Sequence, residues 1–292
     1  MAVLGIIGGS GLYDLEGLED IRWEAVESPF GTPSDLIMRG RLGGHEIAFL
    51  PRHGRGHRLM PSGINYRANI DALKRLGVTD ILSLSACGSL REDFAPGDFV
   101  LVDQFIDRTR ARASSFFGNG LVAHVSMAEP TCRRLRQTVA DVAQALDVRV
   151  HDGGTYVVVE GPQFSSRAES ELYRAWGADI IGMTNLPEAK LAREAEICYL
   201  SVGMVTDYDC WHDGHAAVEV AHVLRILKAN AAAARELVAA AVPAILSRRP
   251  EVCPAGCDRA LENAIVTAAE MRDGGLVARL DAVAGRVLGR GP

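Results

Sequence analysis

Seven short apolar runs, rich in Val, Ile and Leu, constrain the fold of this chain more than any other feature of its sequence. Continuous apolar runs of this length are typical of strands that are buried on both faces of a sheet. Helical patterns separate them, which predicts an α/β fold with a mostly parallel or mixed sheet. The predicted strands are residues 3–7, 46–50, 80–84, 99–102, 155–159, 179–182 and 197–202, and the predicted helices are residues 65–76, 130–146, 166–176, 187–195 and 218–246.

Composition and charge exclude several classes of protein. The chain has 292 residues, 48% of them hydrophobic, which is enough to bury a large core. Its net charge of −6 disfavours a general nucleic-acid surface, because duplex binding requires clustered Lys and Arg. It has no run of 18 or more apolar residues, and its N-terminus lacks the basic region and cleavage site of a signal peptide. We therefore expect a cytoplasmic protein without a membrane or nucleic-acid partner.

The six cysteines are scattered along the chain, and a chain of this size does not need disulfides, so we expect reduced thiols. Cys253 and Cys257 form the one close pair. Metal and redox sites generally use a tighter Cys-x-x-Cys spacing or further ligands nearby, so we predict a structural or incidental role for this pair and no metal site.

The pattern of alternating strands and helices ends at Arg248-Arg249-Pro250. Beyond it, residues 257–271 and 275–288 have the pattern of two Ala-rich amphipathic helices without recognisable chemistry. We therefore divide the chain into a main domain, residues 1–247, and a helical extension, residues 248–292, with a packing or assembly role.

Small or polar residues follow five of the predicted strands. In open α/β sheets, ligands bind at the carboxyl ends of the strands, so these residues predict one convergent site. They are Gly8-Gly9-Ser10-Gly11, Arg52-His53-Gly54, Ser85-Ala86-Cys87-Gly88, Met183-Thr184 and Thr206-Asp207-Tyr208-Asp209.

Two of these segments have the chemistry of anion binding. The turn with Ser10 lets the backbone approach an anion, but it matches neither the P-loop pattern nor the dinucleotide fingerprint. The basic run from Arg52 to Arg58 offers guanidinium groups for phosphate oxygens and His53 as a further donor. A solvated basic loop is the alternative interpretation of this run.

Asp207 and Asp209 are a pair of acids after a strand, and in extended geometry they would share one face. Such a pair can bind a metal, act as acid and base, or recognise the hydrogen-bonding groups of a purine. A metal would need more ligands than these. Adenine offers a donor at N6 and an acceptor at N7, which two carboxyl groups can match. A capping or solvated pair is the other interpretation.

Several motifs, in order along residues 3–245, resemble those of the 5′-methylthioadenosine phosphorylase family, a branch of the trimeric purine nucleoside phosphorylases. The resemblance implies a single α/β domain around a mixed, partly barrel-like sheet, a homotrimer, and inorganic phosphate as co-substrate without any cofactor. The motifs are residues 6–12, 28–34, 52–57, 65–69, 86–91, 103–109, 160–169, 182–188 and 206–211.

The resemblance also assigns roles to individual positions. It implies that Asp207 and Asp209 recognise the base, with Asp207 as the catalytic acid that protonates or hydrogen-bonds N7 and Asp209 at N6 or holding Asp207. It places Met183 under the ribose, Phe164 near the base, and His124 of a neighbouring subunit near the 5′ substituent together with Val220 and Val223. The positions that match phosphate contacts are Ser10, Arg52, His53, Ser85, Ala86 and Thr184. Gly182 departs from the Asn that many animal relatives have there.

The expected reaction is phosphate-dependent cleavage of 5′-methylthioadenosine to adenine and 5-methylthioribose 1-phosphate. The nearest alternative is the same reaction on another purine nucleoside, such as adenosine, inosine or a 5′-deoxyadenosine with a different 5′ group. A dinucleotide-dependent oxidoreductase and a non-catalytic nucleoside-binding protein are alternatives of other classes.

Overall fold

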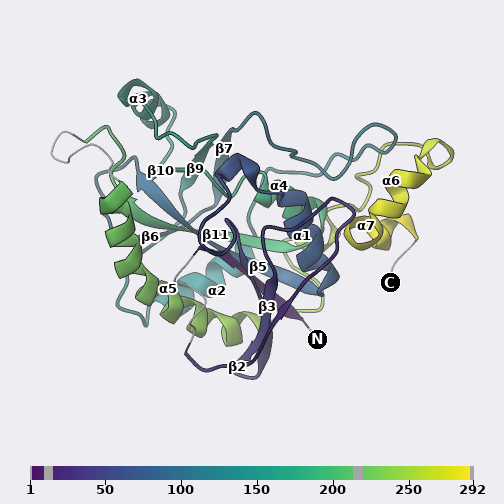
Figure 1. Ribbon diagram of the computed structural model, residues 1–292, viewed down its shortest axis with the longest axis horizontal. Helices are drawn as coiled ribbons and strands as arrows, with labels where there is room; N and C mark the ends of the chain where they lie inside the picture. The colour runs from purple at the N-terminus through teal and green to yellow at the C-terminus, as the bar shows by residue number, and fades with distance from the viewer. Residues whose placement is uncertain (1, 10–15, 213–219, 290–292) are drawn as a thin grey trace.

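The strand β5 (Val78–Ser89) organises the sheet of the computed structural model, which describes residues 2–9, 16–212 and 220–289 (Figure 1). Along one edge, β5 pairs in parallel with β1 (Val3–Gly8) and then, at Gly88 and Ser89, in antiparallel with β10 (Ile180–Gly182). Along its other edge it pairs in parallel with β11 (Cys198–Asp207). The sheet therefore forks at the end of β5.

The sheet formed by the described residues has 11 strands. Their mixed orientation confirms the predicted fold class. One path runs β2-β3-β4-β1-β5-β10-β9-β7, and β11, β6 and β8 form the branch on the other side of β5. The remaining strands are β2 (Leu18–Glu24), β3 (Ile37–Leu42), β4 (His45–Pro51), β6 (Phe99–Leu101), β7 (Gln104–Arg108), β8 (Val150–Asp152) and β9 (Thr155–Val159).

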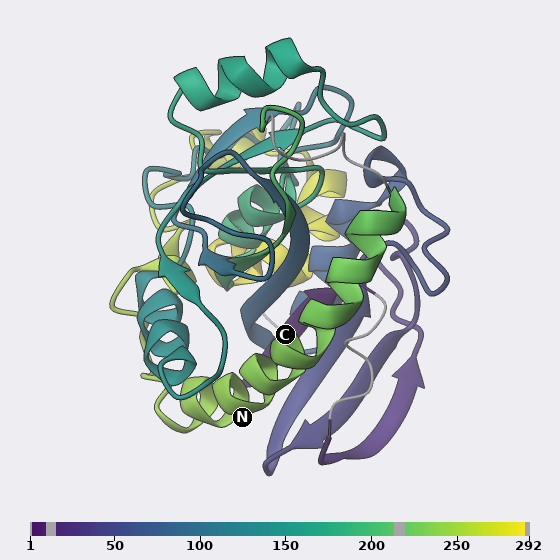
Figure 2. The ribbon, with the colours of Figure 1, turned by 90° about the vertical axis from the view of Figure 1, so that its left-hand side faces the viewer.

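Helices cover both faces of the sheet, and all five predicted in the main domain are confirmed. On one face, α1 and α4 share a core cluster, and on the other, α2 and α5 share a second (Figure 2). Capping residues explain why the predicted starts of α1 and α3 are accurate. The Asn65 side chain accepts from the Ala68 N–H at 3.1 Å, and Ser166 forms a capping box with Glu169. The helices are α1 (Tyr66–Arg75), α2 (Arg133–Ala143), α3 (Arg167–Ala175), α4 (Glu188–Glu194) and α5 (Val220–Ser247).

Part of α5 is long and apolar enough to span a membrane by length and composition: residues Leu224–Ser247 have a mean hydropathy of 1.3. The core helices of soluble proteins pass the same test. Here Leu237, Val238 and Ile245 are buried against the sheet and α2, which accounts for the apolar character of the helix.

The C-terminal segment differs from the prediction. Residues 275–288 do form helices, α6 (Gly274–Arg279) and α7 (Asp281–Leu288). Residues 257–271 do not form the predicted helix and contain only two short 3-10 turns. Their backbone pairs instead with residues 122–124: Ile265 forms a bridge with Ala123, and the Thr267 hydroxyl accepts from the Val122 N–H at 2.8 Å. Tertiary pairing has overridden the helical pattern of the segment.

The extension is part of the core on the α1 and α4 side, where Figure 1 shows α6 and α7 in yellow beside α1. Leu261, Leu280 and Val283 are each at most 2% exposed within this core. Arg286 binds Glu196 at 2.6 Å, and the same carboxylate accepts from the Leu261 N–H at 2.9 Å. The boundary at residue 247 stays a prediction.

We predict that Leu280→Ala destabilises the whole protein by about 2–5 kcal/mol, because it leaves a cavity in the main core. Val266→Ala is the matched control, since Val266 lies in the same extension but is 60% exposed. Urea unfolding at neutral pH measures both. A separate unfolding transition of residues 248–292, with the main transition unchanged in Leu280→Ala, would contradict this result.

Candidate active site

The predicted site residues converge where β4, β5, β10 and β11 end, and a buried ion pair lies at their centre. The Nε of Arg52, directly after β4, donates to Oε2 of Glu188 at 2.9 Å. Both side chains are 2% exposed. The Arg52 Nη1 also donates to the Leu84 carbonyl in β5 at 3.0 Å, so one guanidinium connects β4, β5 and the first turn of α4.

Glu188 is the acceptor that holds this network together. Its carboxylate also accepts from the Ser83 hydroxyl at 2.6 Å and from the Tyr199 hydroxyl at 2.8 Å. Burial opposes its negative charge, but Arg52 and these donors outweigh burial and lower the pKa of Glu188. The pair is therefore charged and almost fully hydrogen-bonded. The sequence analysis overlooked Glu188, although an acid in the first turn of a predicted helix, following a polar strand end, was a visible signal.

The network changes what Arg52 is able to do for a phosphate. Its Nε and Nη2 point to Glu188 and Ser83, which leaves Nη1 as the side of the guanidinium with a remaining N–H. Bidentate binding of an anion through Nε and Nη2 of Arg52 is thus excluded in this arrangement.

Further along the basic run, Arg55 is exposed and binds Asp35 at 2.9 Å. The solvated-loop interpretation holds for Arg55, His57 and Arg58, which are all exposed.

His53 is mostly buried and uncharged at neutral pH. Its Nδ1 lies 2.8 Å from the Leu59 carbonyl, which can only accept, so Nδ1 carries the hydrogen and Nε2 is left as an acceptor. Burial lowers the pKa of His53 to about 4, against the effect of the Leu59 carbonyl, and the charge of Arg52 adds to the lowering. The His57 ring stacks on it with the centroids 4.2 Å apart.

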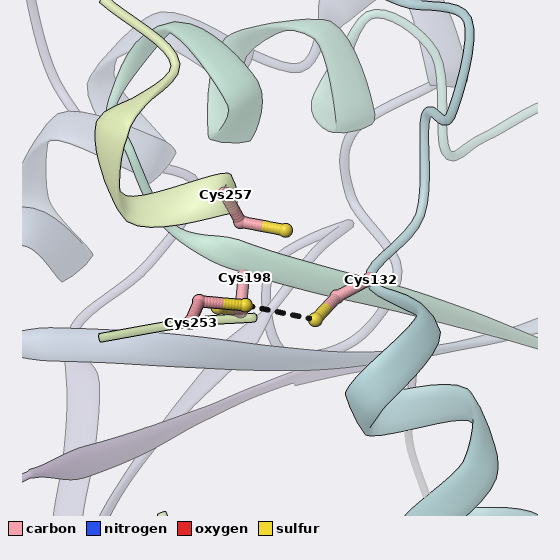
Figure 3. A group of neighbouring side chains, drawn as sticks. All are labelled: Cys132, Cys198, Cys253 and Cys257. Atoms are coloured by element: carbon pink, nitrogen blue, oxygen red, sulfur yellow. Dashed lines mark hydrogen bonds between the residues drawn. The ribbon is translucent and has the colours of Figure 1, made fainter. Parts of the chain in front are cut away.

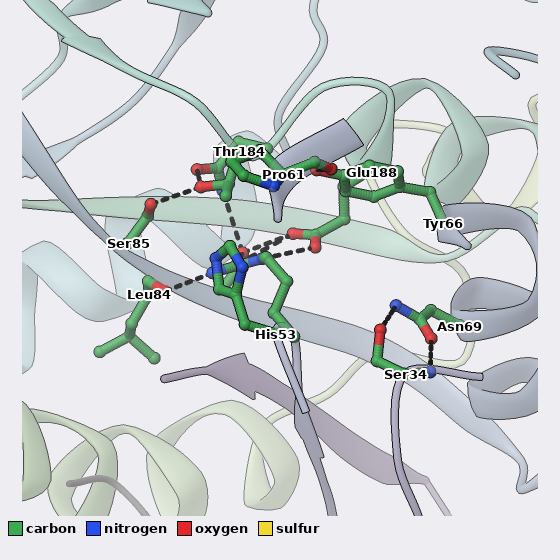
Figure 4. A network of polar contacts seen from close by, with 12 residues as sticks. Ser34, His53, Pro61, Tyr66, Asn69, Leu84, Ser85, Thr184 and Glu188 are labelled. Atoms are coloured by element: carbon green, nitrogen blue, oxygen red, sulfur yellow. Dashed lines mark hydrogen bonds and ion pairs between the residues drawn. The ribbon is translucent and has the colours of Figure 1, made fainter. Parts of the chain in front are cut away.

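Two hydroxyls form the polar end of this group. The Oγ atoms of Ser85, in β5, and Thr184, after β10, lie 2.5 Å apart. Ser85 is 6% and Thr184 is 5% exposed, and Figure 4 shows the two side chains joined, in a view that also contains Glu188 and His53. Ala86 follows Ser85 in the strand, and its carbonyl accepts from the Ser85 hydroxyl at 3.3 Å. The structure therefore brings together all the described residues that were predicted to contact phosphate.

The departure at Gly182 has a steric explanation. A Cβ atom on Gly182 would lie 2.1 Å from the hydroxyl oxygen of Tyr156, which comes from β9. That hydroxyl is buried without a hydrogen-bond partner among the described residues. Burial raises the pKa of Tyr156, whereas the nearby hydroxyls of Ser85 and Thr184 act to lower it. Glycine at position 182 thus admits a phenol beside the hydroxyl pair, and the sequence analysis did not identify this tyrosine.

The two acids lie at the end of β11, beside Gly88 of β5. The Asp207 carboxylate accepts from the Thr206 hydroxyl at 2.7 Å and from the Asp209 backbone N–H at 2.8 Å. The segment is not extended at Asp209, whose φ of 50° turns the chain, yet both side chains lie next to Gly88. Burial raises the pKa of Asp209, and the negative charge of Asp207 adds to this rise.

Met183 and Phe164 lie on the segments that connect the strand ends of the candidate site to a hollow in the surface. A Cβ on Gly161 would lie 2.5 Å from the Met183 sulfur, so the methionine packs directly on the 160–164 segment. Phe164 is 46% exposed and lines the hollow with Arg108, Glu160 and Tyr173. The Ser165 carbonyl accepts from the Cys210 thiol at 3.3 Å, which brings this segment next to the acids.

Of the remaining predicted positions, only the His124 side chain is described. Ser10 falls outside the described residues, and the side chains of Val220 and Val223, in the first turn of α5, are likewise not described. His124 is exposed, and its backbone N–H donates to the Ala264 carbonyl of the extension at 2.9 Å. Its predicted role, in the site of a neighbouring subunit, stays a prediction.

Comparisons with known proteins identify the family of the chain. The family model of the phosphorylase superfamily matches residues 3–246. Two curated relatives, the S-methyl-5′-thioadenosine phosphorylases of Cereibacter sphaeroides and Rhodospirillum rubrum, are each 62% identical over 98% of this chain and cover 98% and 97% of their own lengths.

Solved structures give the same result. A methylthioadenosine phosphorylase from an antarctic soil metagenomic library has a TM-score of 0.91 at 49% identity, covering 97% of this chain and 98% of its own. The methylthioadenosine phosphorylase of Schistosoma mansoni in complex with adenine has a TM-score of 0.78 at 41% identity, covering 84% of this chain and 92% of its own.

The fold and the superfamily match together define a nucleoside phosphorylase-like α/β protein. With relatives this similar over nearly its whole length, the chain belongs to the S-methyl-5′-thioadenosine phosphorylase family of the phosphorylase superfamily.

We predict that His53 makes the protein less stable in mild acid. The neutral ring is favoured in the folded state, so the unfolded chain binds the extra proton first as the pH falls from 6.5 towards 4. Relative to His53→Asn, whose amide can also donate to the Leu59 carbonyl, the wild type loses about 2 kcal/mol of unfolding free energy between pH 7 and pH 5.

Urea unfolding of both proteins at the two pH values measures this difference. Parallel losses in the wild type and His53→Asn would show that the ring titrates as freely in the folded protein as in the unfolded chain.

Proposed function

We propose that this protein cleaves S-methyl-5′-thioadenosine with inorganic phosphate, giving adenine and 5-methylthioribose 1-phosphate. The observation that carries the proposal is that two chemically different groups lie against the same strand, β5. The hydroxyl pair of Ser85 and Thr184 lies at one point of β5, and Asp207 lies beside Gly88 further along it. The names of the curated relatives support the same reaction.

Ser85 and Thr184 supply hydroxyl donors for phosphate oxygens, with Ser10 and the backbone at Ala86 as further contacts. His53 contributes in a different way from the predicted donor role. Because its Nε2 is an acceptor, it binds the O–H of a monoprotonated phosphate, or it takes up a proton when the dianion binds. Arg52 contributes positive charge from behind this group, and its remaining N–H lies on the Nη1 side. Positioning and electrostatic stabilisation of this kind are the main contributions available to a phosphorolysis.

Asp207 and Asp209 act on the purine as it leaves. The bond between the anomeric carbon and N9 breaks, its electron pair goes to the purine, and a phosphate oxygen forms the new bond to the sugar carbon through an oxocarbenium-like transition state. Asp207 protonates or hydrogen-bonds N7 of the leaving adenine, and Asp209 accepts from N6 or holds Asp207. Burial raises the pKa of Asp209 and the charge of Asp207 adds to the rise, so this carboxyl holds a proton more readily than a free aspartate does.

The sugar contacts complete the proposal. Met183 lies under the ribose and Phe164 near the base, while Val220 and Val223 surround the 5′ substituent with His124 of a neighbouring subunit. The exposure of His124 fits a contact between subunits, in a homotrimer located in the cytoplasm. No cofactor takes part, since phosphate is itself the nucleophile.

We predict that Asp207→Asn lowers kcat/KM for S-methyl-5′-thioadenosine by ~10²–10⁴-fold, the usual contribution of a general acid. The same variant gains relative activity on inosine, because the asparagine amide can donate to O6 of a 6-oxopurine. Asp147→Asn, at an exposed position away from the site, is the matched control. Purine release, followed with and without phosphate, measures each activity.

Unchanged turnover of S-methyl-5′-thioadenosine in Asp207→Asn would remove Asp207 from the mechanism. Turnover of the wild type that does not require phosphate would overturn the proposed reaction itself. Faster cleavage of adenosine or inosine than of the methylthio nucleoside would assign the enzyme to another substrate of the same class.

A further inference from the structure

Four cysteines from three distant parts of the chain meet in the core on the α2 and α5 side of the sheet (Figure 3). Cys132 precedes α2, Cys198 begins β11, and Cys253 and Cys257 belong to the extension. All four are buried, none is more than 3% exposed, and their sulfur atoms lie within 4.8 Å of one another. The sequence analysis considered only Cys253 and Cys257, because the fold alone brings the other two to them.

The distances fit a tetrahedron of sulfurs around a metal ion. The sulfurs of Cys132 and Cys253 lie 3.7 Å apart. A disulfide bond would require about 2.05 Å. In a tetrahedral zinc site with Zn–S bonds of about 2.3 Å, neighbouring sulfurs are about 3.8 Å apart, which is close to the spacing observed here.

The backbone around the sulfurs holds them in place before any metal binds. Gly256, with a φ of 71°, turns the chain between Cys253 and Cys257, and its N–H donates to the Cys253 carbonyl at 2.9 Å. The Asp258 carboxylate accepts from the Cys253 N–H at 2.7 Å. On the other side, the Cys132 N–H donates to the Tyr199 carbonyl at 2.7 Å, which fixes Cys132 next to the strand that carries Cys198.

A guanidinium near the cluster lacks an acceptor. Arg134 and Arg249 both bind the one buried carboxylate of Asp80. The Nε of Arg134 is buried without a hydrogen-bond partner among the described residues. A thiolate at Cys198 would offer this group an acceptor.

We propose that Cys132, Cys198, Cys253 and Cys257 form a structural zinc site that fastens the C-terminal extension to the main domain. Four buried thiolates without an open position are the ligand set of structural zinc, as opposed to catalytic zinc. On binding, each thiol releases its proton to solvent, so the site takes up one Zn²⁺, loses four protons and carries a net charge of −2. This site replaces the expectation that Cys253 and Cys257 are incidental.

Metal analysis of the purified full-length protein tests the site. The protein is prepared under reducing conditions without chelator and analysed by mass spectrometry for zinc and iron. We expect about one zinc per chain in the wild type, and loss of most of it in Cys198→Ser and Cys253→Ser. Cys210→Ser is the matched control, because Cys210 lies outside the cluster, and it should retain the metal.

A second measurement does not depend on the variants folding. Titration of the wild type with an organic mercurial should release zinc to a chromophoric chelator, and the apparent melting temperature should fall as the metal leaves. Protein refolded with Co²⁺ should show the ligand-field and sulfur charge-transfer bands of a tetrahedral thiolate site. Zinc-free wild type with four freely titrating thiols, disulfides among these cysteines in the reduced preparation, or iron in place of zinc would each overturn the proposal.

Discussion

The buried ion pair between Arg52 and Glu188 is the interaction on which the rest of the site depends. It joins the end of β4, the middle of β5 and the first turn of α4 through charged hydrogen bonds in the absence of solvent. Breaking a buried pair by removing one partner generally costs 3–5 kcal/mol, since the other charge is left uncompensated. Here the hydroxyls of Ser83 and Tyr199 complete the coordination of the carboxylate, so both charges are accommodated. The hydroxyl pair of Ser85 and Thr184 lies next to this rigid ion-pair network.

The residues that hold the site in place differ from the residues that are proposed to act on the substrates. Arg52 is held by Glu188 and Leu84, and in the proposed mechanism its charge acts on the phosphate that His53, Ser85 and Thr184 contact. The base end is built differently: Asp207 is oriented by Thr206 and by the turn at Asp209, and burial acts on Asp209. Ser85 belongs to β5, and Asp207 lies at the end of β11, which pairs with β5. In the proposed mechanism, the fork of the sheet therefore sets the spacing between the phosphate and the purine.

The sequence predicted the main elements because their signals are local. The buried strands are continuous apolar runs, and Asn65 and Ser166 mark the beginnings of α1 and α3. Four strands carry no such run and were missed: the half-exposed β2 and β7, the short β8, and β3, whose apolar residues are interrupted by Arg39 and Arg41. Residues 257–271 were misjudged because their partners, residues 122–124, are distant in sequence. For the same reason, Glu188 as the partner of Arg52, Tyr156 beside Gly182, and the meeting of four cysteines became visible only in three dimensions.

The steady-state kinetics of Glu188→Gln, with each substrate varied in turn, test the central claim most directly. Glu194→Gln is the control, a second buried glutamate of α4 whose pKa burial raises to about 7, so that its neutral form is accessible without rearrangement. If the ion pair supports the phosphate end, Glu188→Gln raises the KM for phosphate by at least ~10-fold, about 1.4 kcal/mol, while the KM for the nucleoside stays near that of the control. Equal increases for both substrates, or no increase for phosphate, would contradict this account.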